Sequence, residues 1–210
     1  MQSYLSCNRF TTSFEIEKSV FESAVAPVRE EAEAEAFVRA IREKNPDATH
    51  NCYAYLCDAE KNVYRFSDDG EPAKTAGLPI LEAIRGRGLY NTAVVVSRWF
   101  GGIKLGAGGL VRAYSRAALA AIDGAGVRKF ERGVRLSVRC GYEILPRLEN
   151  LLNRRGYPCE KRFGERVETL FWARESEAEE LKKEVLDLSG GRAELGAAEF
   201  GFRCFGEENF

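Results

Sequence analysis

Residues 97–115 constrain the fold more than any other part of this chain. Five glycines lie there among three cations and three aromatic residues, directly after the apolar segment 93–96. This order predicts a buried strand, a glycine-rich loop and the start of a helix. Backbone N–H groups of such a loop can converge before a helix N-terminus, where the helix dipole favours negative charge. The run therefore predicts a backbone cradle for an anion.

Charge is distributed unevenly along the chain. The formal net charge of −1 excludes a uniformly polybasic protein of the histone-tail kind. Between Glu82 and Arg116, however, six cations stand against one acid: Arg85, Arg87, Arg98, Lys104, Arg112 and Arg116. Any contact with nucleic acid must therefore come from this local stretch.

Hydrophobic periodicity and turn residues predict the elements of the first half. We expect strands within residues 13–28 and at 52–57, 63–66 and 92–99, and helices at 30–44, 76–84 and 110–122. The polar turn 67–72 separates the second hairpin strand from the helix at 76–84.

A second unit is predicted from about residue 133. Strands at 135–141, 159–163, 167–173 and 193–205 alternate with helices at 144–155 and from 176 onward. The order β-α-β-β-α-β is the ferredoxin-like split βαβ pattern. We therefore predict an α+β protein of two domains, residues 1–132 and 133–210.

Cysteine usage and hydropathy indicate a cytoplasmic protein. Six cysteines are scattered without a C-x-x-C pair, and the single histidine, His50, rules out zinc-finger spacing. We expect reduced thiols and no metal or cofactor. No apolar run approaches the roughly 18 residues that span a bilayer, so we expect no membrane contact.

The glycine loop does not match the common phosphate-binding patterns. A Walker A loop needs lysine after its second glycine, but Ala107 follows Gly106. A Rossmann fingerprint needs a third glycine where Val111 stands. Two interpretations stay open, a phosphate or other anion held between Gly101 and Gly109, and glycines that merely allow close helix–sheet packing.

The acidic turn and the histidine allow a catalytic interpretation and a structural one. Asp68, Asp69 and Glu71 could hold Mg²⁺ through carboxylate oxygens, or could pair with the arginines and position them. Histidine is the side chain best suited to proton transfer near neutral pH, but His50 could equally be a hydrogen-bonded structural residue. No G-x-S-x-G elbow accompanies a serine nucleophile.

Four ordered motifs resemble those of the IMPACT family in its bacterial YigZ-like form, and the resemblance covers nearly the whole chain. The motifs are D-A-T-H-N-C-Y-A-Y at 47–55, S-D-D-G-E-P at 67–72, T-A-G-L-P-I at 75–80 and S-R-W-F-G-G-I-K-L-G-A-G-G-L-V-R-A-Y at 97–114. The family commonly has tyrosine at the position of Trp99 and a small residue near Lys74.

The resemblance implies a fold for each domain and a role in translation. The first domain should be like ribosomal protein S5 domain 2, and the second like the ferredoxin-like modules of elongation factor G. Bacterial members have no settled activity. Eukaryotic relatives regulate translation initiation by binding a protein activator of an initiation-factor kinase.

We therefore expect a noncatalytic cytoplasmic binding protein, linked to regulation of translation, that contacts RNA, the ribosome or a translation-related protein. The alternative is an enzyme acting on a phosphorylated small molecule or nucleotide. No catalytic residue is assigned. The predicted binding surface consists of His50, Asn51, Asp68, Asp69, Glu71, Arg98, Gly101, Gly102, Lys104, Gly106, Gly108 and Arg112.

Overall fold

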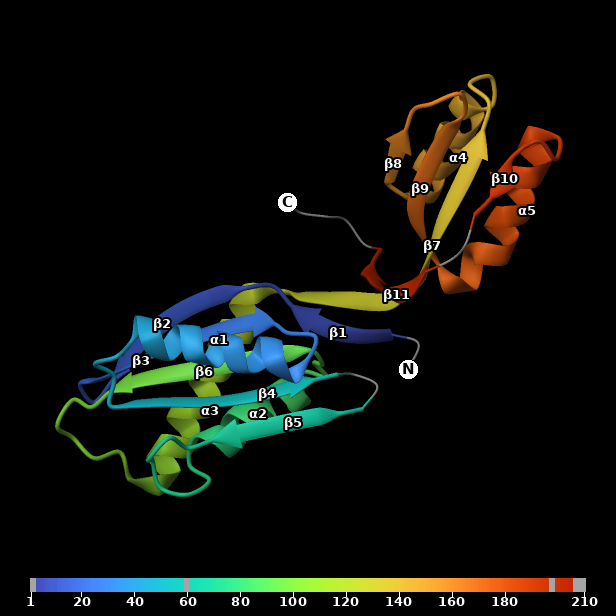
Figure 1. Ribbon diagram of the computed structural model, residues 1–210. Coiled ribbons are helices and arrows are strands. Elements are labelled where there is room, and N and C mark those ends of the chain that lie inside the picture. The colour runs from blue at the N-terminus through green and yellow to red at the C-terminus, as the bar shows by residue number, and fades with distance from the viewer. Residues whose placement is uncertain (1–2, 59–60, 197–198, 206–210) are drawn as a thin grey trace. The chain divides into compact units, whose positions relative to one another are not determined.

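A computed structural model describes residues 3–58, 61–196 and 199–205 of the chain. The chain divides into two compact units between Arg128 and Lys129. Each unit combines strands with helices (Figure 1), which confirms the predicted α+β architecture of two domains. The division falls within strand β7 (Val127–Cys140), which begins in the first unit and continues into the second.

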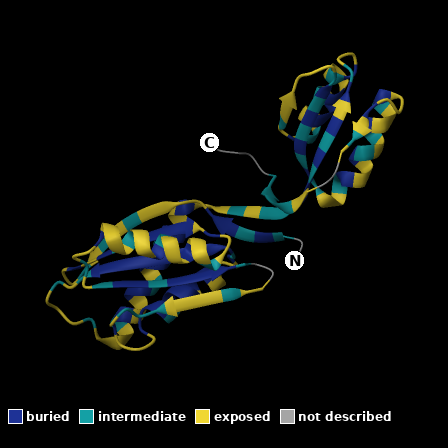
Figure 2. Ribbon diagram, viewed as in Figure 1, coloured by how far each residue is buried: buried dark blue, intermediate teal, exposed yellow. Residues whose placement is uncertain are grey.

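The first unit is built on a five-stranded antiparallel sheet. Its order is β2-β3-β6-β4-β5, and all four pairings are antiparallel. The strands are β2 (Phe10–Ile16), β3 (Ser19–Pro27), β6 (Thr92–Trp99), β4 (His50–Cys57) and β5 (Val63–Ser67). The middle strands are mostly buried, whereas β5 at one edge is largely exposed (Figure 2).

Helices cover both faces of this sheet. Helices α2 (Gly77–Gly86) and α3 (Gly106–Ala125) pack on one face over a core that includes Phe21, Val94 and Ile122. Helix α1 (Glu31–Lys44) packs on the other face through Ala34 and Phe37, against Tyr55 and Ala93. The unit therefore has three layers with a hydrophobic core on each side of the sheet.

Helix α3 begins earlier than predicted. It starts at Gly106 and not at Leu110, so the second half of the expected glycine loop is the first turn of the helix. Gly106 has a φ of 68°, a conformation that favours glycine. Burial of Leu110 and Tyr114 against the sheet outweighs the low helix propensity of the three glycines. The prediction of a loop through Gly109 is wrong for this reason.

The second unit has the predicted ferredoxin-like order. Strand β7 is followed by α4 (Leu145–Arg155), β8 (Cys159–Arg162), β9 (Val167–Arg174), a short 3₁₀ helix η1 (Glu175–Glu177), α5 (Ala178–Ser189) and β10 (Glu194–Leu195). β11 (Glu199–Cys204) pairs with the first half of β7. The expected last strand is thus two short strands. Within the unit the sheet order is β7-β9-β8, with β10 and β11 also paired to β7. β1 (Ser3–Cys7), which also pairs with β7, belongs to the first unit and was not predicted.

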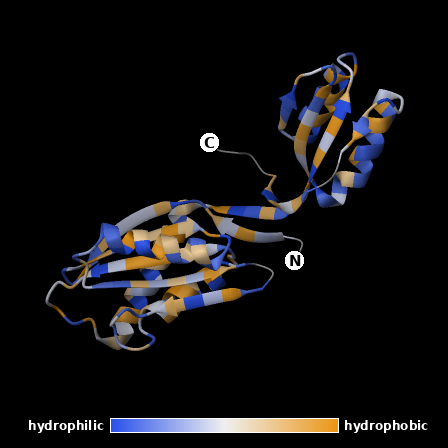
Figure 3. Ribbon diagram, viewed as in Figure 1, coloured by the Kyte–Doolittle hydropathy of each residue, from blue (hydrophilic) through white to orange (hydrophobic). Residues whose placement is uncertain are grey.

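Both helices of the second unit pack on the same face of its sheet. Leu148 of α4 and Leu181 of α5 meet Leu136 of β7 and Phe171 of β9 in one core. Burial alternates along β9, but the hydropathy coloured in Figure 3 does not follow it strictly, because Thr169 is buried whereas Leu170 is only half-buried. Residues such as Leu170 and Trp172 therefore lie on the opposite face, which neither of the described helices α4 and α5 covers.

The six cysteines, all among the described residues, are free thiols. Within residues 3–58, 61–196 and 199–205, no helix has both the length and the apolar character needed to cross a membrane.

Candidate functional site

Three segments of the first unit meet at one end of its sheet (Figure 1). They are the start of β4, the turn that follows β5, and the loop between β6 and α3. Cross-strand register places His50 directly opposite Arg98, and Asn51 opposite Ser97. Because neighbouring residues of a strand point to opposite faces, His50 and Arg98 face α2 and α3, whereas Asn51 and Ser97 face α1.

The carboxylate of Asp68 holds the start of helix α2. Its Oδ1 accepts hydrogen bonds from the backbone N–H groups of Ala76 and Gly77 at 3.0 and 2.9 Å, and its Oδ2 accepts one from Lys74 at 2.8 Å. The first N–H groups of a helix have no partner within the helix, and negative charge is favourable there. Asp68 therefore acts as a cap contributed from the preceding turn.

Asp69 joins β4 to helix α1. Its Oδ2 accepts a hydrogen bond from the backbone N–H of Asn51 at 2.7 Å, just beyond the point where β5 stops pairing with β4. Its Oδ1 accepts one from Arg42 of α1 at 2.7 Å. The side chain thus continues the hydrogen-bond ladder of the sheet and ties it to the helix.

Glu71 lies at the centre of a buried charged cluster. Its Oε1 accepts hydrogen bonds from Arg98 at 2.6 Å and from the Tyr114 hydroxyl of α3 at 2.7 Å. The side chains of Glu71 and Arg98 are only 4% and 5% exposed. Burial, together with neighbouring Cys52 and Glu71, raises the pKa of Tyr114, so the phenol stays protonated and donates to Glu71.

His50 lies at the edge of this cluster. Its Nδ1 is 2.8 Å from the backbone carbonyl oxygen of Asp69. Because that oxygen can only accept, Nδ1 carries a proton, and Nε2 then lies 4.0 Å from the free oxygen of Glu71. The imidazole is partly exposed, and it is the member of the cluster with access to solvent.

Cys52 and Asn51 belong to the buried framework. The Cys52 thiol donates to the Asp68 carbonyl at 3.0 Å, and burial raises its pKa to about 12, which excludes a reactive thiolate near neutral pH. On the α1 face, the Asn51 side-chain oxygen accepts a hydrogen bond from Ser97, whose hydroxyl accepts one from Asn45. The Asn51 side chain is therefore part of a separate network.

The loop after β6 is anchored to the sheet at its first residues. Phe100 donates its backbone N–H to the Thr49 hydroxyl, and Gly101 donates to the Ser19 hydroxyl, which also accepts from Arg98. A Cβ on Gly101 would overlap the backbone carbonyl of Lys18. The Arg98 guanidinium lies between the rings of Phe21 and Phe100, 5.4 and 5.5 Å from their centres. Gly101 is required here because the two backbones touch.

Most residues from Phe100 to Gly108 are exposed. Phe100 and Ile103 are 46% and 40% exposed, and Val111 on α3 is also exposed. Lys104 and Arg112 are exposed too, and neither forms an ion pair with any residue that the structure describes. We call these residues the loop surface: Phe100, Ile103, Lys104, Val111 and Arg112.

The structure thus divides eleven of the twelve predicted binding residues into two groups, and the side chain of Asn51 belongs to the separate network on the α1 face. His50, Asp68, Asp69, Glu71, Arg98 and Gly101 meet in one connected network. Gly102, Lys104, Gly106, Gly108 and Arg112 lie in the exposed loop and the first turns of α3. In the described part of the chain, no group of three or more His, Cys, Asp or Glu side chains is arranged to hold a metal ion.

Comparison with known proteins decides the family. The Impact N-terminal domain matches residues 17–122, and a domain of unknown function, DUF1949, matches residues 138–192. The chain belongs to the IMPACT family. The predicted resemblance is therefore confirmed, and all twelve predicted binding residues lie within the Impact N-terminal match.

Individual relatives agree with this assignment. The IMPACT family member YvyE of Bacillus subtilis is 37% identical over 183 residues, 86% of this chain and 83% of that protein. The member YigZ of Escherichia coli is 39% identical over 140 residues, 66% of this chain and 69% of that protein. Protein IMPACT of Mus musculus is 38% identical over 94 residues, 42% of this chain but 29% of the mouse protein.

A solved structure shows the same fold over almost the whole chain. This crystal structure of an hypothetical protein is 32% identical, with a TM-score of 0.64. The match covers 95% of this chain and 98% of that chain.

Several residues of the IMPACT site were not predicted from sequence. Ser19, Arg42 and Thr49 were missed because each is far in sequence from its partner. Tyr114 lies in the fourth motif, but its role as a donor to Glu71 depends on where α3 packs. The antiparallel pairing of β4 with β6 could have indicated part of this network, because its register places His50 opposite Arg98.

Proposed function

We propose that this IMPACT-family chain is a noncatalytic, cytoplasmic binding protein linked to the regulation of translation, and that its loop surface contacts RNA on the ribosome. The observation that carries the proposal is the use of the acidic groups. The carboxylates of the acidic turn accept hydrogen bonds from backbone N–H groups, arginines and a tyrosine of the same unit: those of Asp68, Asp69 and Glu71. These acids therefore hold the structure that supports the exposed loop surface.

The chemistry of the loop surface suits a phosphate backbone. Lys104 and Arg112 are cations without ion-pair partners among the described residues, and such cations neutralise phosphates by releasing counterions. Helix α3 begins at Gly106 without a side-chain cap, so its first N–H groups can donate to a phosphate or another anion. The exposed ring of Phe100 offers a base a stacking partner.

The family relationship supports the choice of translation as the process. The resemblance associates eukaryotic relatives with translation initiation, and the similarity to mouse Protein IMPACT spans 94 residues of this chain. Only the field of action, translation, is extended from those relatives to this chain. The exposed cations and ring of the loop surface are the reason to expect contact with RNA.

Salt-dependent binding tests the proposal. We expect binding to purified bacterial ribosomes and to ribosomal RNA to weaken steeply with salt, and Lys104→Ala and Arg112→Ala each to reduce the slope of log K against log salt by about 0.7 to 0.9. Arg39→Ala is the matched control, because Arg39 is an exposed cation on α1, across the sheet. Fluorescence anisotropy and ribosome pelleting measure the effect.

Two results would contradict RNA binding at the loop surface. One is binding that does not depend on salt, and the other is equal loss in Arg39→Ala. Binding that survives nuclease treatment of the ribosome fraction, but still requires Lys104, would identify a protein partner instead.

His50 gives a specific reason to keep an enzyme as the second candidate. Its Nδ1 is fixed by the Asp69 carbonyl while Nε2 faces Glu71, an arrangement that can accept and return a proton. This candidate predicts turnover of a phosphorylated small molecule or nucleotide that is lost in His50→Ala. A phosphoester and nucleotide screen without turnover counts against it.

A further inference from the structure

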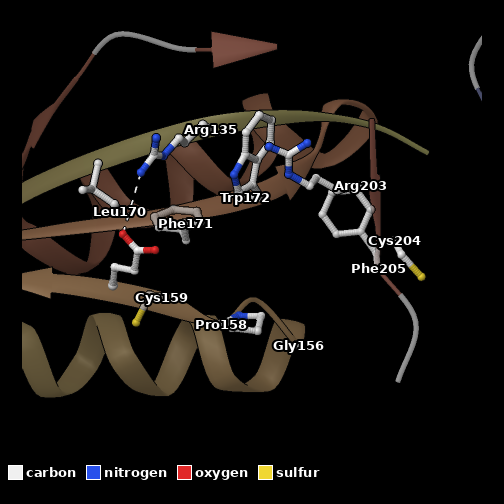
Figure 4. Close-up of a pocket in the computed structure, with 11 residues that line it drawn as sticks. Arg135, Gly156, Pro158, Cys159, Leu170, Phe171, Trp172, Arg203, Cys204 and Phe205 are labelled. Atoms are coloured by element: carbon white, nitrogen blue, oxygen red, sulfur yellow. Dashed lines mark ion pairs between the residues drawn. The ribbon is translucent and has the colours of Figure 1, made fainter. Parts of the chain in front are cut away.

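The second unit contains a groove that plays no part in the loop surface. Its volume is about 660 Å³, within the range of roughly 300 to 1,000 Å³ typical of ligand sites. Residues of β7, β8, β9 and β11, the segment before β8 and the residue after β11 line it: Arg135, Gly156, Pro158, Cys159, Glu160, Leu170, Phe171, Trp172, Arg203, Cys204 and Phe205. Figure 4 shows the indole of Trp172 between the side chains of Arg135 and Arg203.

Strand register places four lining residues on the face away from α4 and α5: Arg135, Glu160, Leu170 and Trp172. Trp172 of β9 lies opposite Arg135 of β7, and Leu170 lies opposite Glu160 of β8. The inward neighbours Leu136 and Phe171 pack in the core with the helices. The groove therefore opens on the sheet surface that neither described helix of the unit covers.

The groove combines a stacking platform with cations. The Arg203 guanidinium lies 3.7 Å from the centre of the Trp172 ring, so the two planar groups form a stack that another flat ring can extend. Arg135 forms ion pairs of 3.8 Å with Glu160 and 3.5 Å with Glu199, whose side chains are 77% and 62% exposed. Loose, solvated pairs of this kind contribute little, so a phosphate can take the place of either carboxylate at small cost.

The topology matches a known way of presenting bases. A four-stranded βαββαβ sheet with aromatic side chains on its open face is the platform on which RNA recognition motifs stack two or three bases. Here the order β10-β7-β9-β8 makes β7 and β9 the central pair. Trp172 and Arg135 are among the residues of this pair that line the groove.

We propose that this groove binds single-stranded RNA, with a base stacked on the Trp172–Arg203 pair and a phosphate held by Arg135. It is a second RNA site, on a domain without an assigned function, and it does not depend on the loop surface. A protein segment could offer an aromatic side chain to the stack, but an unmodified one carries no phosphate for Arg135.

Tryptophan fluorescence tests the site in the full chain. The chain has two tryptophans, one in each unit, so Trp99→Phe leaves Trp172 as the sole reporter. We expect an octamer of uridylate to quench Trp172 in this variant. In anisotropy measurements with the same octamer, Trp172→Ala should weaken binding about 5- to 100-fold, and Trp172→Phe by less than about 3-fold. Phe163→Ala is the control, an exposed aromatic of the same unit outside the groove lining.

Three outcomes would overturn the proposal. The first is that the octamer, at a saturating concentration, does not quench Trp172 fluorescence, a result that does not depend on whether Trp172→Ala folds. The second is that Trp172→Ala binds the octamer with unchanged affinity; if Lys104→Ala then weakens binding, the loop surface alone holds RNA. Uridine monophosphate binding as tightly as the octamer would make the groove a site for free nucleotides and not for a strand.

Discussion

Arg98 in the first unit and Arg135 in the second both pair with glutamates, but in opposite surroundings. Arg98 is buried with Glu71, between two aromatic rings and in contact with Ser19. Arg135 is paired loosely with two exposed carboxylates. A buried charge must keep its partner because water cannot replace it, whereas an exposed one can exchange partners freely. The first arginine therefore specifies structure, and the second is available for a ligand.

The largest expected effect comes from breaking the buried pair. Glu71→Leu leaves the Arg98 charge without its carboxylate, and we expect the first unit to lose about 3 to 5 kcal/mol of unfolding free energy. Urea unfolding of a Trp172→Phe background, followed by Trp99 fluorescence, reads the first unit. Adding Arg98→Met should restore much of the loss, because no unpaired charge then remains. Equal stability of the single and double variants would show that the unpaired charge is not the cause.

A smaller effect is expected at the anchor of the loop. Gly101→Ala forces a Cβ into the Lys18 carbonyl, which we expect to cost about 1 to 3 kcal/mol. Gly108→Ala is the matched comparison, because a Cβ there meets only the flexible end of Arg112 and replaces glycine within α3. It should stabilise by about 0.5 to 1 kcal/mol. The same fluorescence assay measures both, and equal destabilisation would argue against backbone contact at Gly101.

Removing the Asp68 cap on helix α2 should have a smaller effect on stability, and it tests whether this carboxylate has a structural role. Asp68→Ala removes the acceptor of three backbone N–H groups, and we expect a loss of about 1 to 2 kcal/mol. Asp68→Asn keeps one acceptor oxygen and should lose less. If Asp68→Ala left stability unchanged in the urea assay, the carboxylate would be free for another role.

The smallest effect is expected at the exposed pair of the second unit. Glu160→Gln should change stability by less than about 1 kcal/mol, and the difference should vanish at high salt because surface pairs are screened. Urea unfolding of a Trp99→Phe background, read through Trp172, measures it. A loss as large as that of Glu71→Leu would remove the contrast between the two arginines.

The sequence predicted helices and strands with a strong local hydrophobic pattern better than features that depend on contacts between distant residues. The apolar run of β6 was found with its bounds at 92 and 99, because a fully buried strand leaves a continuous hydrophobic segment. β1 was missed because five residues with partners far along the chain carry no local signal. The glycines at 106–109 were assigned to a loop because their helical state depends on tertiary packing.

The candidate site was predicted as a set of residues and not as a network. His50, the acidic turn and the glycine run were singled out from their residue types, and the structure brings only some of these residues together. That Glu71 pairs with Arg98 and Tyr114, 27 and 43 positions away, follows from sheet register and helix packing together. Neither is visible in local periodicity.

The placement of Arg98 between Phe21 and Phe100 gives the first unit a built-in spectroscopic probe. Ring currents of the two phenyl groups displace the guanidinium N–H resonances of this arginine from those of solvated ones. Phe21 is fully buried, so its contribution is constant, whereas Phe100 is exposed and belongs to the loop surface. A molecule that moves Phe100 therefore changes the chemical shift of one buried side chain, and nuclear magnetic resonance can detect a ligand there without any label on the ligand.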